Sequence, residues 1–135
     1  MDTNITFDKL RQATILIRKG LPFIGTNPDK TFPTPDGLMP GAGSILAAIE
    51  AASETKPIIA GKPEPLLYNM AMERLGVSRQ QTLAIGDRLD TDILGGQNAG
   101  CYTAVVLTGV SSREAAYLWQ PAPDIIAPDL MSIFK

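Results

Sequence analysis

Histidine is absent from this chain of 135 residues, and its absence excludes several kinds of catalytic site at once. Nucleophilic sites that pair serine or cysteine with histidine are ruled out, as are zinc sites with histidine ligands. Cysteine occurs once, as Cys101, so no disulfide can form within the chain. A single cysteine fits the reducing cytoplasm, which is the location we expect.

Long apolar runs and basic stripes are missing as well. No run approaches the ~18 residues that a transmembrane helix needs, and the N-terminus lacks the basic and apolar stretches of a signal peptide. The net charge is −2 and no basic stripe is present, so neither a membrane nor nucleic acid is an expected partner. With 44% apolar and 19% charged residues, the composition is typical of a folded globular chain.

A regular alternation of helix and strand is the main pattern after residue 60. Apolar runs predict strands at 82–85, 102–107 and 125–126, and helical periodicity predicts helices at 64–75, 91–99 and 112–119. On helix 64–75 we expect Leu67, Ala71 and Leu75 to share one face. Such alternation is typical of parallel βαβ units, so the predicted fold class is α/β.

The first part of the chain is less regular. We expect helices at 7–19 and 44–53 and short strands at 21–26 and 56–60. Between them, residues 27–43 contain four prolines and three glycines, which predicts a loop with several turns.

Asp87 is the first candidate functional residue, because it follows Gly86 at the end of the predicted strand 82–85. Open α/β sheets bind their ligands at the carboxyl ends of their strands. A carboxylate there can bind a hard divalent cation such as Mg2+, which prefers oxygen ligands and keeps several waters. A helix cap or a solvated loop carboxylate is the alternative that this position leaves open.

Asp92 comes five residues later, at the start of the predicted helix 91–99. A carboxylate in the first turn of a helix stabilises that helix, and this role alone would explain it. The alternative is that Asp92 orients Asp87 and a metal-bound water from behind. Asp90, between the two, is expected to point into solvent.

Lys62 stands in the segment Ala60-Gly61-Lys62-Pro63, directly after the predicted strand 56–60. The proline that follows stiffens this connection, so the lysine is held in place. A positioned ammonium group could neutralise a phosphate and a nearby carboxylate. The alternative is an ordinary surface lysine.

Two further segments carry weaker indications. Residues 26–29, Thr-Asn-Pro-Asp, form either a simple turn or a polar loop that faces a small substrate. Residues 40–44, Pro-Gly-Ala-Gly-Ser, resemble a phosphate-binding loop only loosely. They lack the Gly-Lys-Ser/Thr ending of such loops, so we assign them no phosphate site.

A family resemblance rests on four segments in this order: FIGTNPDKTFPTPDGLMPGAGSILAAIEAA, IIAGKPEP, LAIGDRLDTDILGGQNAG and VVLTGVSS. Together they resemble the NagD-like, 4-nitrophenylphosphatase-like branch of the haloacid dehalogenase (HAD) superfamily, over nearly the whole chain. The resemblance implies that residues 1–58 are the C-terminal part of a cap domain that selects substrates. Residues 59–135 would be the C-terminal part of a Rossmann-like parallel-sheet core.

The family hydrolyses phosphate monoesters with Mg2+, so the resemblance implies a role for each candidate residue. Lys62 would steady the phosphoryl group and the attacking aspartate, Asp87 would bind Mg2+, and Asp92 would support it. Asn27 and Asp29 would lie on the mobile cap, and the substrate would be a small phosphorylated metabolite. In the family, an aspartate attacks phosphorus to form an aspartyl-phosphate that water then cleaves, and a second aspartate protonates the leaving oxygen.

The chain departs from the family pattern at the nucleophile. The family's Asp-x-Asp-Gly-Thr motif does not occur in these 135 residues, and the Ser or Thr of the second motif is missing at its expected place. Asp90 and Asp92 have the right spacing, but they follow the Gly86-Asp87 turn and open a helix. The resemblance therefore covers only the C-terminal half of the family's fold. We expect the chain alone to hydrolyse phosphate esters poorly or not at all, because a covalent nucleophile is worth several orders of magnitude in rate.

Half of a parallel sheet would leave a strand edge and an apolar face uncovered, so we expect a homo-oligomer or pairing with the missing half. Two functional hypotheses follow: a fragment of a Mg2+-dependent phosphatase, or a degenerate, non-enzymatic HAD-like module that serves in binding or oligomerisation. A phosphate-accepting receiver-like domain with Asp87 as acceptor is disfavoured, because receivers need an acidic pair after an earlier strand.

Overall fold

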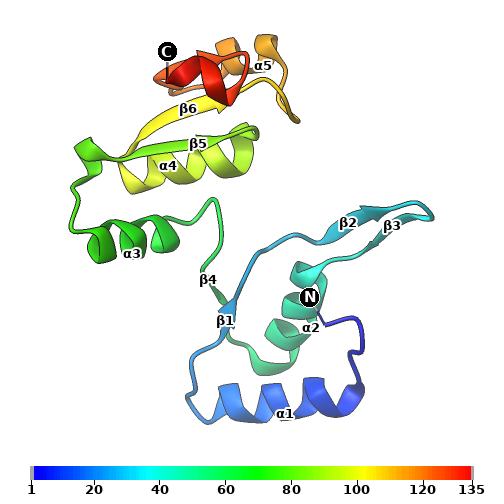
Figure 1. Ribbon diagram of the computed structural model, residues 1–135. Helices are drawn as coiled ribbons and strands as arrows, with labels where there is room; N and C mark the ends of the chain where they lie inside the picture. The colour runs from blue at the N-terminus through cyan, green and yellow to red at the C-terminus, as the bar shows by residue number, and fades with distance from the viewer. Residues whose placement is uncertain (1, 135) are drawn as a thin grey trace. The chain divides into compact units, whose positions relative to one another are not determined.

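The computed structural model describes residues 2–134, and these residues form two compact units that divide between Gly61 and Lys62 (Figure 1). The boundary expected from the sequence follows residue 58. Among the described residues, no helix is both long enough and apolar enough to cross a membrane.

The first unit is built on two helices, α1 (Phe7–Arg18) and α2 (Ala42–Ser53), and on two short parallel strands, β1 (Ile24–Gly25) and β4 (Ile58–Ile59). Thr6 starts α1 by accepting a hydrogen bond from the Lys9 N–H at 3.3 Å. The core of this unit is apolar and comes from both helices and the strand-entry segment: Ile17, Phe23 and Ile49.

The segment 27–43 was expected to be a loop, and this expectation was wrong. It contains a β-hairpin of β2 (Thr31–Thr34) and β3 (Gly37–Pro40), paired antiparallel. A two-stranded ribbon has only outer edges, so prolines can lie in its strands with their nitrogens away from the partner strand. Pro35 and Asp36, both common turn residues, connect the two strands.

The second unit contains a three-stranded parallel sheet in the order β5-β6-β7, which confirms the predicted α/β class. Its strands are β5 (Leu83–Gly86), β6 (Tyr102–Val106) and β7 (Ile125–Ala127), and its α-helices are α3 (Leu66–Leu75), α4 (Leu94–Ala99) and α5 (Arg113–Leu118). Ile93, Val105 and Ala116 are fully buried together in its core.

The sheet is covered unevenly. Ala84 and Thr103 are paired across β5 and β6, and both contact the space beside Gly96 of α4, so α4 covers that face. On the opposite face, Ile85, Tyr102 and Ile125 have exposed fractions of 36%, 52% and 38%. The same face also carries three buried residues: Ala104, Val106 and Ala127. Parallel sheets are normally covered on both faces, so the partial exposure of this second face is unusual.

Helix α3 buries a different stripe from the one expected. Met72 is buried and Tyr68 is half-buried against Ala84 and Cys101, whereas Leu67 and Leu75 are exposed. Apolar residues occupy neighbouring stripes of this helix, so periodicity alone does not select the inward face. The helix ends as predicted, with Gly76 in the left-handed conformation at φ 65°.

The packing of Ile93 allows a first prediction. Ile93→Ala removes a side chain that is 0% exposed, so it should lower the free energy of unfolding by about 2–5 kcal/mol, through lost burial and a cavity. Leu118→Ala, at a side chain 80% exposed, is the control and should change it by less than about 0.5 kcal/mol. Urea unfolding followed by circular dichroism measures both. Equal losses in the two variants would contradict the packing described here.

Candidate active site

The candidate site lies at the carboxyl edge of the sheet in the second unit. Asp87 directly follows β5, and the loop 107–112 directly follows β6. Because β5 and β6 are adjacent and parallel, both chain segments leave the sheet at the same edge. This is the edge at which open α/β sheets bind ligands.

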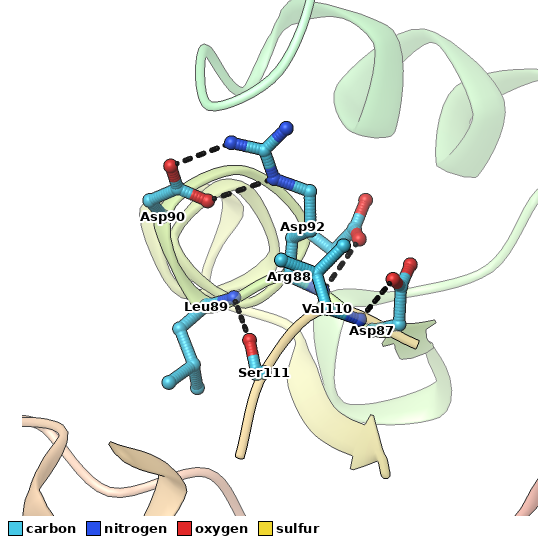
Figure 2. Close-up of polar contacts among 7 residues, drawn as sticks. All are labelled: Asp87, Arg88, Leu89, Asp90, Asp92, Val110 and Ser111. Carbon is cyan, nitrogen blue, oxygen red and sulfur yellow. Dashed lines mark hydrogen bonds and ion pairs between the residues drawn. The ribbon is translucent and has the colours of Figure 1, made fainter. Parts of the chain in front are cut away.

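Asp87 is held by the loop that follows β6 (Figure 2). Its Oδ2 accepts a hydrogen bond from the Val110 N–H at 2.9 Å, and its backbone carbonyl accepts one from the Ser111 N–H at 3.0 Å. No hydrogen bond to its Oδ1 is found among residues 2–134. One oxygen of this carboxylate is therefore fixed and the other is available.

Asp92 is buried, with 8% of its surface exposed, and both of its carboxylate oxygens have donors. Oδ1 lies 2.6 Å from Nζ of Lys62. Oδ2 accepts a hydrogen bond from the Arg88 N–H at 3.1 Å, which Figure 2 shows. Its carboxylate also occupies the space where a side chain at Gly86 would begin: a Cβ there would lie 2.5 Å from Oδ2.

Asp92 lies in the first turn of its helix, as predicted, but it is not the residue that caps it. The chain from Leu89 to Ile93 is a π-helical turn that runs into α4, and the N–H groups of Asp92 and Ile93 both donate to the Arg88 carbonyl. The Asp92 side chain accepts from Arg88, which precedes the turn, so it does not act as an N-cap. Asp90 is exposed, as expected, and pairs with the Arg88 guanidinium, which lowers the pKa of the Asp90 carboxyl.

Lys62 is held in its charged form by its surroundings. Its hydrogen bond to Asp92 raises the pKa of the Lys62 ammonium; partial burial opposes this rise, and the charges of Asp92, Tyr68 and Asp87 add to it. Tyr68, in the first turn of α3, donates a hydrogen bond to the Asp92 carbonyl at 3.2 Å. Lys62, Asp87 and Asp92 therefore lie within electrostatic reach of one another.

The site suits an anionic ligand that brings its own cation. The Lys62 side chain is 51% exposed, so its ammonium group can meet a ligand while it remains paired with Asp92. Within residues 2–134, no group of three or more acidic, cysteine or histidine side chains forms a complete metal cage. A single carboxylate with one available oxygen still fits Mg2+, which commonly binds through one or two carboxylates, waters and ligand phosphates.

Asn27 and Asp29 lie in the first unit, where they form a tight turn. Oδ1 of Asn27 accepts a hydrogen bond from the Asp29 N–H at 3.1 Å, and both residues line a cavity of about 220 Å³. The N–H of Gly43 in α2 donates to the Asp29 carbonyl at 2.8 Å. Gly43 of the segment 40–44 thus helps to hold this turn.

The sequence analysis missed the residues that hold the site. Tyr68, Val110 and Ser111 were not singled out, although each donates a hydrogen bond to Asp87 or Asp92. The sequence did contain a signal for Val110 and Ser111. They follow the predicted strand 102–107, which comes next after the strand before Asp87, so their position at the same sheet edge could have been inferred.

Comparison with known proteins agrees with this geometry. The family described as HAD-hydrolase-like matches residues 59–133, which is more than half of the chain. The chain belongs to the HAD-like hydrolase family.

Relatives of this HAD-like chain place it in the NagD-like branch, as the resemblance implied. It is 36% identical to the acid sugar phosphatase of Staphylococcus saprophyticus, over 100% of this chain and 52% of that protein. Among solved structures, it is 41% identical to the 4-nitrophenylphosphatase of Thermotoga maritima, with a TM-score of 0.81, over 98% of this chain and 51% of that one.

A third relative was solved with a metal. The chain is 39% identical to the glycerol phosphate phosphatase of Mycobacterium tuberculosis in complex with magnesium, with a TM-score of 0.83, over 98% of this chain and 40% of that one. The HAD-like chain thus spans about half of the length of the proteins it matches.

The pairing of Lys62 with Asp92 allows a second prediction. Lys62→Met leaves a buried carboxylate with a single backbone donor, so it should lower the free energy of unfolding by about 1–3 kcal/mol at pH 7. Because folding raises the pKa of Lys62 above its ordinary 10.5, the stabilisation is complete below that pH and is lost as the pH rises through the folded value.

The difference in stability between wild type and Lys62→Met should therefore shrink above pH 10.5. Urea unfolding at several pH values measures it. Lys9→Met is the control, because Lys9 pairs with an exposed carboxylate in the first unit. A difference that stays constant into the alkaline range would contradict the ion pair.

Proposed function

We propose that this chain is the C-terminal half of a Mg2+-dependent HAD-like phosphatase that hydrolyses small phosphorylated metabolites. The observation that carries the proposal is the Lys62–Asp92 ion pair beside Asp87 at the carboxyl edge of a parallel sheet. Relatives at 36–41% identity that are named as phosphatases support it. Asn27 and Asp29 would contribute to substrate selection from the cap.

Each of the three candidate site residues in the second unit then has a chemical role. Lys62 binds the phosphoryl oxygens and offsets their charge, and Asp92 keeps its ammonium group in place. The available Oδ1 of Asp87 would hold Mg2+, which would supply charge neutralisation for phosphoryl transfer. The attacking aspartate would come from the half of the fold that this sequence does not contain.

The partly exposed sheet face supports pairing with the missing half of the phosphatase fold. Ile85, Tyr102 and Ile125 leave part of one sheet face exposed, and the outer edge of β5 has no neighbouring strand within residues 2–134. Since the relatives are about twice as long as this chain, the half that they add is the occupant we propose for this face. A second copy of this chain would be the alternative occupant.

A third prediction concerns activity. Alone, the chain should hydrolyse 4-nitrophenyl phosphate with Mg2+ at close to the uncatalysed rate. Mixed with the remaining half of the S. saprophyticus relative, it should gain turnover. Asp87→Asn should reduce that turnover by about 100-fold or more, because a metal contributes several kcal/mol to such reactions.

Asp90→Asn is the matched control for this assay, since Asp90 is exposed and pairs only with the neighbouring Arg88 among the contacts described. It should retain the turnover of the mixture. Turnover by the chain alone at ordinary phosphatase rates would contradict the missing nucleophile. A stable complex of the two halves without turnover would favour the non-enzymatic binding module.

A fourth prediction concerns assembly. In light scattering at micromolar concentration, the isolated chain should self-associate, because its apolar sheet face is uncovered. Ile85→Lys should weaken both this association and the pairing with the other half, whereas Glu114→Lys, on α5, should leave both unchanged. A monodisperse monomer that also fails to pair would contradict the proposed interface.

A further inference from the structure

The loop after β6 contacts Asp87 through three consecutive residues. Gly109 lies against the Asp87 side chain, the Val110 N–H donates to its Oδ2, and the Ser111 N–H donates to its backbone carbonyl. The Ser111 hydroxyl also accepts a hydrogen bond from the Leu89 N–H at 3.2 Å, which joins the loop to the turn after Asp87 (Figure 2). The loop therefore binds both the side chain and the backbone at this position.

The space beside Gly109 is filled by the carboxylate itself. A Cβ at this position would lie 2.5 Å from both Cβ and Cγ of Asp87, and closer still to Oδ2. Such distances are far below van der Waals contact, so any larger residue must displace either the loop or the Asp87 side chain. Gly109 is thus required for this particular orientation of the carboxylate.

These contacts make the two carboxylate oxygens of Asp87 different. Oδ2 is occupied by the Val110 N–H, while Oδ1 has no hydrogen bond among residues 2–134. A carboxylate that can rotate loses entropy when it binds a cation, whereas one already fixed presents its available oxygen without that cost. Partners of this kind orient metal ligands and typically change metal affinity by about 10- to 100-fold.

We propose that the segment Gly109–Ser111 is a positioning element that aims Oδ1 of Asp87 at a divalent cation. This inference rests on the proposed function, because it takes Asp87 as the metal ligand. It assigns the positioning to a backbone N–H and to the missing side chain of a glycine, neither of which carries metal chemistry of its own.

The test uses Mn2+ and the full 15N-labelled chain. Bound Mn2+ broadens the amide signals near its site, so a titration followed by NMR gives a dissociation constant even when binding is weak. Gly109→Ala and Val110→Pro should each weaken binding by about 10- to 100-fold. Thr108→Ala changes an exposed residue of the same loop that makes no described contact with Asp87, so it should stay within about threefold of wild type.

Thermal unfolding of every variant provides the second measurement. Equal melting temperatures combined with weakened Mn2+ binding support positioning over general destabilisation. If Gly109→Ala and Val110→Pro both bind Mn2+ as wild type does, while Asp87→Asn does not bind it, the inference is overturned and the metal assignment stands. If Asp87→Asn binds like wild type, or wild type shows no broadening around residue 87, both the metal assignment and the inference are overturned.

Discussion

The burial of one carboxylate constrains the whole candidate site. A buried carboxylate needs donors for its oxygens, and Asp92 receives them from the Lys62 ammonium group and the Arg88 N–H. The contact with Lys62 joins the segment before α3 to the turn after β5, across thirty residues of sequence, and the contact with Arg88 lies within that turn. Gly86 must lack a side chain for Asp92 to lie there. The same contacts that satisfy this carboxylate therefore hold a cation whose pKa is also raised by the charge of Asp87.

The parallel pairing of two strands is enough to bring Asp87 and the loop that holds it to the same place. Since β5 and β6 are neighbours, Asp87 and the loop Gly109–Ser111 reach the same edge, where one holds the other. The arrangement separates two tasks: Lys62 is fixed through Asp92, and Asp87 is fixed through the backbone of the loop. Neither depends on a flexible side chain for its orientation.

The uncovered face of the sheet agrees with the share of its relatives that this chain spans. Ile85 and Tyr102 lie on strands that parallel sheets normally bury on both sides, yet both are partly exposed. The chain corresponds to about half of each relative that it matches.

The sequence by itself determined the α/β class, the parallel strands and the places of Lys62, Asp87 and Asp92, because periodicity, strand-end position and motif order are local properties of the chain. It did not determine the hairpin in residues 27–43, since prolines are tolerated in a two-stranded ribbon only when their nitrogens face outward. Nor did it select the buried stripe of α3, where apolar residues occupy several faces. Tertiary structure decided the hairpin and the buried stripe of α3. It also decided that Asp92 is paired with Lys62. The reason is that packing between distant segments determines which groups meet in a buried space.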